Sequence, residues 1–136
     1  MSARGRKSKK RTVFAAGCFN RVHQAHVTLL KTARAFGDEL IVVISHDAHT
    51  RKQNAVPAVR RRLWIEGLGI ADRVIVGRAE SFAQSLRQAR PDVLVLGYDQ
   101  RFPDAETASA VRELGIRVVQ LPWYPGKERP WPGQGS

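Results

Sequence analysis

TVFAAGCFNRVHQAH, residues 12–26, joins a short run of strand-forming residues to the start of a helix. The run ends in Gly17, which allows a turn and a close approach of the backbone to a ligand. The segment that follows has apolar residues at helical spacing on one face. The stretch therefore predicts a strand, a tight corner and a helix, with His23 and His26 at the corner although the whole chain has only 4 histidines.

The same alternation continues along the chain. ELIVVIS, DRVIVG, DVLVLG and IRVVQLP are short apolar runs that predict four more strands. Residues 24–38, 59–70, 79–91 and 103–115 predict the helices, with Gly and Pro near several of their ends. Strands this apolar, separated by helices, indicate a parallel sheet covered on both faces. We therefore expect an α/β, Rossmann-like fold with an open five-stranded parallel sheet and helices on both faces.

Composition and charge divide the 136 residues into three parts. Residues 1–11 hold six Lys and Arg and no acid, and predict a disordered basic tail. We expect one domain over residues 12–122 and an irregular, Pro- and Gly-rich tail over 123–136. The net charge of +11 suits either a solvated arm or contact with nucleic acid, and a phosphate-rich ligand suits the basic body.

The predicted location is cytoplasmic, without contact to a membrane. Cys18 is the only cysteine, so a disulfide within the chain is impossible and a reducing compartment is the default. No apolar run approaches the roughly 18–20 residues of a membrane span. No apolar stretch follows the basic N-terminus, so we do not expect a secretory signal.

The corners that follow the strands are where a ligand is expected. In open parallel sheets, ligands bind at the carboxyl ends of the strands, near the point where the strand order reverses. His23 and His26 fall on one face of a first helical turn, whose free N–H groups and positive dipole end favour an anion. Two imidazoles there can donate hydrogen bonds to phosphate and stabilise charge during phosphoryl transfer.

Other side chains at these corners have alternative interpretations. His23, His26, His46 and His49 could converge on zinc, but structural zinc sites usually include cysteine and Cys18 is alone, so we predict no metal bound by the protein. Asp47 could accept a hydrogen bond from a ribose or stabilise its loop. Trp64 is interpreted as a core residue and not as a stacking platform.

Residues 17–26, GCFNRVHQAH, resemble the G-T-F-D-x-x-H-x-G-H signature of the nucleotidyltransferase superfamily. LLKTARAFGDELIVVISHD and RRRLWIEGLGIADRVIVG are similar to later segments of its small cytidylyltransferases. PDVLVLGYDQRF is similar to the fourth strand of the archaeal-type FAD synthases. The resemblance covers about residues 12–122 and supports the same sheet.

The resemblance implies in-line attack by an acceptor phosphate on the α-phosphorus of a nucleoside triphosphate. His23 and His26 would bind the triphosphate and stabilise the transition state, and Mg²⁺ would screen its charge. The nucleotide-binding residues would be Ala16, Gly17, Cys18, Phe19, Arg61, Gly97, Tyr98 and Asp99. Asn20 and Lys52, or Arg51 in place of Lys52, would bind the acceptor or its phosphates.

The resemblance favours ATP and FMN as substrates, giving FAD and pyrophosphate, on the strength of LGYDQRF. A cytidylyltransferase acting with CTP on a small phosphorylated alcohol is the second reading. Asn20 and Ala25 stand where the signature has Asp and Gly, and the late R-T-x-G-I-S-T-like segment is missing. These departures favour a third reading, a diverged nucleotide- or RNA-binding protein. Relatives often form dimers, so a homodimer is also expected.

Overall fold

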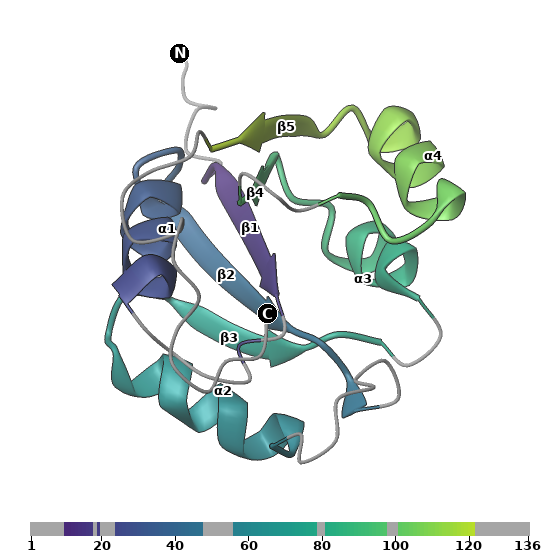
Figure 1. Cartoon of the computed structure of the whole chain (residues 1–136). Helices are drawn as coiled ribbons and strands as arrows, with labels where there is room; N and C mark the ends of the chain where they lie inside the picture. Colours follow the sequence, from purple (N-terminus) through teal and green to yellow (C-terminus); the bar gives the residue numbers. More distant parts are fainter. Residues whose placement is uncertain are drawn as a thin grey trace.

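The computed structural model describes residues 10–17, 19, 24–47, 56–78, 81–97 and 101–121. In this part of the chain, strands and helices alternate (Figure 1). They run in the order β1 (Thr12–Gly17), α1 (Gln24–Arg34), β2 (Glu39–Ile44), α2 (Ala58–Gly67), β3 (Arg73–Val76), α3 (Phe82–Ala89), β4 (Val93–Leu96), α4 (Ala105–Leu114) and β5 (Arg117–Gln120). The predicted elements and their order are confirmed.

The strands form one parallel sheet in the order β3-β2-β1-β4-β5. The first half of the chain builds outward from β1 to β3, and the second half returns to β4 on the other side of β1. Figure 1 shows α1 and α2 over one face of the sheet, with α3 and α4 over the other. The strand order therefore reverses between β1 and β4, where a ligand site is expected in such sheets.

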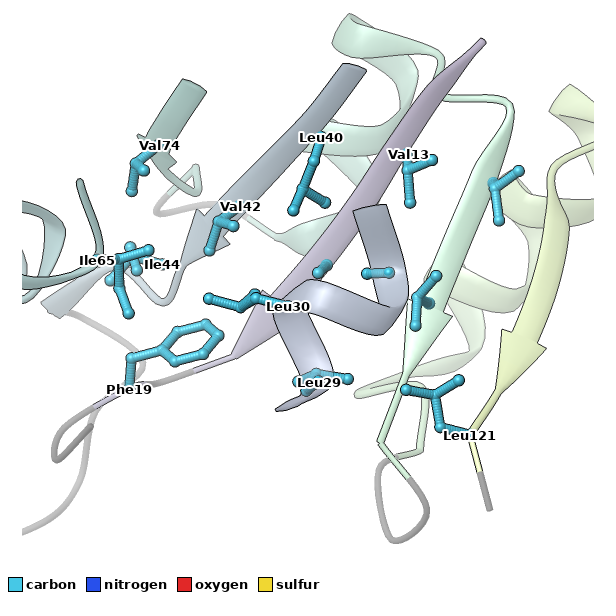
Figure 2. Packing of buried hydrophobic residues seen from close by; sticks show 14 of the residues in the cluster. Val13, Phe19, Leu29, Leu30, Leu40, Val42, Ile44, Ile65, Val74 and Leu121 are labelled. Carbon is cyan, nitrogen blue, oxygen red and sulfur yellow. The ribbon is translucent and has the colours of Figure 1, made fainter. Parts of the chain in front are cut away.

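Successive residues of β1 enter two separate cores. Val13 and Ala15 pack with α1 and α2, whereas Phe14 packs with α3 and α4. Figure 2 shows the first of these cores, with Leu29 and Leu30 of α1 lying over the sheet. Because both faces of the central strand are buried, its side chains are apolar without alternation.

Three aspartates tie the amino ends of neighbouring strands together. Each directly precedes a strand, and its carboxylate accepts a hydrogen bond from a backbone N–H at the start of the adjacent strand. The contacts join Asp38 to Arg11 (2.9 Å), Asp72 to Leu40 (2.8 Å) and Asp92 to Thr12 (2.8 Å). The acids at this edge thus satisfy N–H groups that the sheet itself leaves without a partner.

Local signals explain most helix boundaries. The hydroxyl of Ser81 accepts from the backbone N–H of Gln84 and caps α3, as its position predicts. Gly115 ends α4 in the left-handed region at φ 66°. The helix predicted over residues 24–38 ends earlier, at Arg34, so Gly37 does not stop α1. Gly37 serves close packing instead, because a Cβ there would lie 2.6 Å from Cγ2 of Val13.

Two further observations concern the helices. Trp64 was interpreted as a core residue, and this was wrong, since it is 41% exposed. The buried face of α2 consists of Ala58, Arg61 and Ile65, so the tryptophan is displaced outward. Among the helices that the structure describes, none has the length and apolarity needed to cross a bilayer.

Candidate active site

The carboxyl ends of β1 and β4 meet at the reversal of strand order. The pairing of β1 with β4 ends at Ala15 and Val95, and two residues further along each chain segment are Gly17 and Gly97. The backbone N–H of Ser45, directly after β2, donates to the Gly17 carbonyl at 3.0 Å. Its hydroxyl contacts the same oxygen at 3.3 Å. Hydrogen bonds from the residue after β2 therefore hold the carboxyl end of β1 in place.

The carboxyl end of β4 is held by a residue of β5, the strand on its other side. The side-chain amide of Gln120, the last residue of β5, donates to the Gly97 carbonyl at 3.1 Å. Gly97 opens the corner that was expected to bind the nucleotide. Both glycine corners are thus held by polar side chains from the next strand outward, which keeps them in place without a ligand.

Phe19 shapes the corner after β1. Its φ of 54° lies in the left-handed region, which is unfavourable for a bulky residue, and its side chain is only 3% exposed. A Cβ at Gly17 would lie 2.9 Å from Cε2 of this ring, so the ring occupies the space that glycine leaves. Figure 2 shows the ring directed toward Leu30 of α1. Backbone strain of this kind clusters at ligand sites.

His26 is positioned by that ring. It is the third residue of α1 and is half-buried. Its imidazole meets Phe19 edge to face, with ring centroids 5.1 Å apart and an interplanar angle of 60°. The predicted histidine therefore lies in the first turn of α1, beside the carboxyl end of β1, where helix N–H groups favour an anion.

Arg61 lies inside the protein. Its side chain is fully buried, and its Nε donates to the carbonyl of Val56 at 2.7 Å. Its Nη2 donates to Oδ1 of Asp47 at 3.0 Å. The same oxygen accepts the backbone N–H of Ala58 at 2.8 Å, at the start of α2. Of the two readings of Asp47, the structure shows the one in which it stabilises its loop, by linking the end of β2 to α2.

The structure brings five of the predicted residues to this edge of the sheet or just behind it: Ala16, Gly17, Phe19, His26 and Gly97. Arg61 stands at the neighbouring helix, held by Asp47. The other predicted residues lie outside the described part of the chain, namely Cys18, Asn20, His23, Lys52, Tyr98 and Asp99. Their roles, and the phosphate contact of Arg61, stay predictions.

The described residues contain no cluster of side chains that could bind zinc. Within 10–17, 19, 24–47, 56–78, 81–97 and 101–121, no three His, Cys, Asp or Glu side chains gather at one point. His23 and His49, which that alternative needs, are outside these ranges.

Sequence reasoning missed Ser45 and Gln120 as parts of the site. Each is a polar residue at the carboxyl end of an apolar strand, and that position was the available signal. Their targets, however, are backbone carbonyls 28 and 23 residues away, which only the strand order brings close.

Comparison with known proteins supplies a family and several relatives. Residues 14–133 match the family described as Cytidylyltransferase-like. The FAD synthase of Aciduliprofundum boonei is 37% identical over 117 residues, which cover 82% of this chain and 78% of the relative. The FAD synthase of Thermoplasma volcanium is 34% identical over 120 residues, covering 85% and 84%.

Solved structures agree on the architecture. The lipopolysaccharide core biosynthesis protein from Thermoplasma volcanium is 33% identical, with a TM-score of 0.76 over 85% of this chain and 99% of its own. Pantoate-beta-alanine ligase from Francisella tularensis is 12% identical, with a TM-score of 0.55 over 87% of this chain and 62% of its own. The second likeness concerns the fold alone.

Proposed function

Because the chain belongs to the cytidylyltransferase-like family, we propose that it is a FAD synthase that transfers the adenylyl group of ATP to FMN. An oxygen of the FMN phosphate attacks the α-phosphorus of ATP and forms a phosphoanhydride bond. The bond from that phosphorus to the oxygen bridging to the β-phosphate breaks. The bridging oxygen leaves with the electron pair as part of pyrophosphate, so no covalent enzyme intermediate is required.

One observation carries this choice of substrates. Proteins named FAD synthase align with this chain at 32–37% identity over most of both lengths. The geometry is compatible with it, because Gly17, Gly97 and His26 lie at the carboxyl edge where the strand order reverses. A nucleotide placed there would meet N–H groups at the start of α1.

The role proposed for the described residues is to pre-organise a phosphate site. Phe19 holds the His26 imidazole from one side, so less motion is lost when a phosphate binds. With His23, it would hydrogen-bond the triphosphate and stabilise the charge that develops on it in the transition state. Arg61 would bind the β- and γ-phosphates only after exchanging its contact with Asp47.

We propose that Mg²⁺ enters as part of the substrate MgATP. Phosphate oxygens and water are its preferred ligands in sites of this kind. Asn20 and Lys52 would bind the acceptor, and Cys18, Tyr98 and Asp99 the nucleotide. Contact with nucleic acid, a homodimer and a cytoplasmic location also stay proposals; light scattering behind a sizing column measures the second directly.

The deciding experiment measures FAD and pyrophosphate with purified full-length protein. ATP and CTP are each paired with FMN and with glycerol 3-phosphate, with and without EDTA. We expect FAD only from ATP, FMN and Mg²⁺. Product from CTP and glycerol 3-phosphate alone would instead establish the cytidylyltransferase reading. Nucleotide binding without any product would establish the binding protein that Asn20 and Ala25 favour.

A pair of variants tests the site itself. His26→Asn should lower kcat by about 10²-fold or more if the imidazole stabilises the transition state. Gln24→Asn, at the exposed first position of the same helix, is the matched control and should change kcat less than twofold. Equal losses in the two variants would contradict the role of His26.

A further inference from the structure

We propose that the amino edge of the sheet, opposite the candidate active site, is a nucleic-acid-binding surface. Its core is formed by the exposed side chains of Arg11, Arg90 and Arg117, called here the amino-edge arginines. They lie directly before β1, shortly before β4 and at the start of β5. All strands are parallel, so these positions share one edge of the sheet.

Contacts within the protein bring Arg11 and Arg117 close together. Arg117 donates its backbone N–H to the carbonyl of Asp92, and Asp92 donates to the carbonyl of Thr12, next to Arg11. The guanidinium carbon of Arg117 stands 6.0 Å from the centre of the Phe36 ring. The neighbouring residue of Phe36, Gly37, would place a Cβ 3.2 Å from Cγ of Arg11. These contacts place Arg11 and Arg117 together, and Arg90 lies two residues before Asp92 in the same segment.

In the described part of the chain, the acids of this edge reduce its positive charge but do not form ion pairs with the amino-edge arginines. Asp38 and Asp92 accept backbone N–H groups, and Asp72 is held by Arg34 and by the N–H of Leu40. Among the residues that the structure describes, no ion pair is formed by the side chains of Arg11, Arg90 or Arg117. Three guanidinium groups thus remain available to an anion.

The sequence adds charge at the same place. Lys10 and Arg11 are the last of six cations within residues 1–11, a segment with no acid. Because β1 begins at Thr12, this segment joins the fold at the amino edge. Lys10, Arg11, Arg90 and Arg117 are four described cations at that edge, and the sequence has four more within residues 1–9, which suits a chain of phosphates.

Nucleic acid fits this patch better than a membrane. Guanidinium groups match phosphodiester oxygens through paired hydrogen bonds. Membrane-surface segments combine cations with a row of apolar side chains. In the described residues, Val59, Leu63 and Trp64 are exposed on α2, and Val118 alone is a large exposed apolar residue next to the amino-edge arginines.

The surface is separate from the transfer chemistry. β1 has 6 residues, so the amino edge is about 20 Å from the corner after Gly17. Both sites can therefore be tested independently in the same protein. A protein that forms FAD but does not bind nucleic acid would contradict this proposal alone. A protein that binds nucleic acid but forms no FAD would contradict the proposed function alone.

The test is fluorescence anisotropy of a labelled 20-nucleotide single-stranded RNA with the full chain at several salt concentrations. We expect log K to fall with log salt at a slope of about −3 or steeper, as for four or more phosphate contacts at about −0.7 each. The double variant Arg90→Gln/Arg117→Gln should weaken binding about tenfold and reduce that slope by about 1.4. FAD formation should be unchanged.

The matched control is Arg60→Gln/Arg101→Gln, which removes the same charge from exposed arginines away from the amino edge. It should change RNA affinity less than twofold. Equal weakening by both double variants would overturn the proposal, because net charge alone would explain binding. Wild-type affinity in the amino-edge variant would overturn it too, as would binding to phosphatidylserine vesicles but not to RNA.

Discussion

The carboxylate of Asp47 and the buried guanidinium of Arg61 are 3.0 Å apart, and the same carboxylate oxygen caps the start of α2. One side chain thus serves a helix end and an enclosed charge. Asp47→Ala should lower the free energy of unfolding by about 2 kcal/mol, since both a cap and a charge partner are lost. Asp47→Asn keeps the acceptor and should cost less. Urea unfolding measures both, and equal stability of Asp47→Ala and wild type would contradict this account.

Any side chain at Gly17 should destabilise the protein for a steric reason. Ala at this position would bring its Cβ within 2.9 Å of the buried Phe19 ring and push the ring against α1. We expect a loss of about 1–3 kcal/mol in stability, together with reduced FAD formation as His26 loses its support. Gly67→Ala is the control, because nothing lies within 4 Å of its added Cβ. It should stabilise α2 by up to about 1 kcal/mol.

Stability should fall in acid partly through Asp72. Hydrogen bonds from Arg34 and then from the Leu40 N–H lower the pKa of this carboxyl group. A lowered pKa in the folded state means that the stabilisation is complete above the unfolded pKa of about 4 and is lost as pH falls below it. Asp72→Asn should therefore flatten the dependence of Tm on pH below about pH 4. An unchanged slope would show that other carboxylates dominate.

Replacing Arg90 with Gly should raise the stability of the protein and weaken its proposed binding of RNA. It ends α3 in the left-handed region at φ 51°, where glycine is preferred. Arg90→Gly should raise the free energy of unfolding by about 0.5–1 kcal/mol, whereas Arg90→Ala should not. Thermal unfolding and RNA titration of both variants separate the backbone effect from the charge effect. A lower Tm for Arg90→Gly than for Arg90→Ala would refute the strain argument.

The fold could be predicted because its signals are local. Each strand is an apolar run buried on both faces, and residues such as Ser81 and Gly115 mark helix ends through their own backbone. The edge that carries the site followed from parallel topology, since carboxyl ends of strands gather there. The sequence pattern therefore predicted that His26 lies at the same edge as Gly17 and Gly97.

What could not be predicted depends on partners distant in sequence. The resemblance assigns Arg61 to phosphate binding. In the structure its side chain is buried and donates a hydrogen bond to the carboxylate of Asp47, 14 residues earlier. That arginine occupies the buried face of α2 and leaves Trp64 outside, against the usual preference of the two residue types. Periodicity reports which face is buried, but it does not report which polar group will be satisfied there.

The paired contacts between Asp92 and Thr12 have a consequence for how the molecule comes apart. Thr12 donates to the Asp92 carboxylate at 2.8 Å, and the backbone N–H of Asp92 donates to the Thr12 carbonyl at 2.9 Å, across 80 residues of chain. This pair of hydrogen bonds lies at the boundary between β1 and β4, where the two halves of the sheet join. We expect the two halves to unfold together, because separating them breaks this pair and the β1–β4 hydrogen bonds. Unfolding should therefore be all-or-none, and a nucleotide bound across this boundary would protect every strand at once.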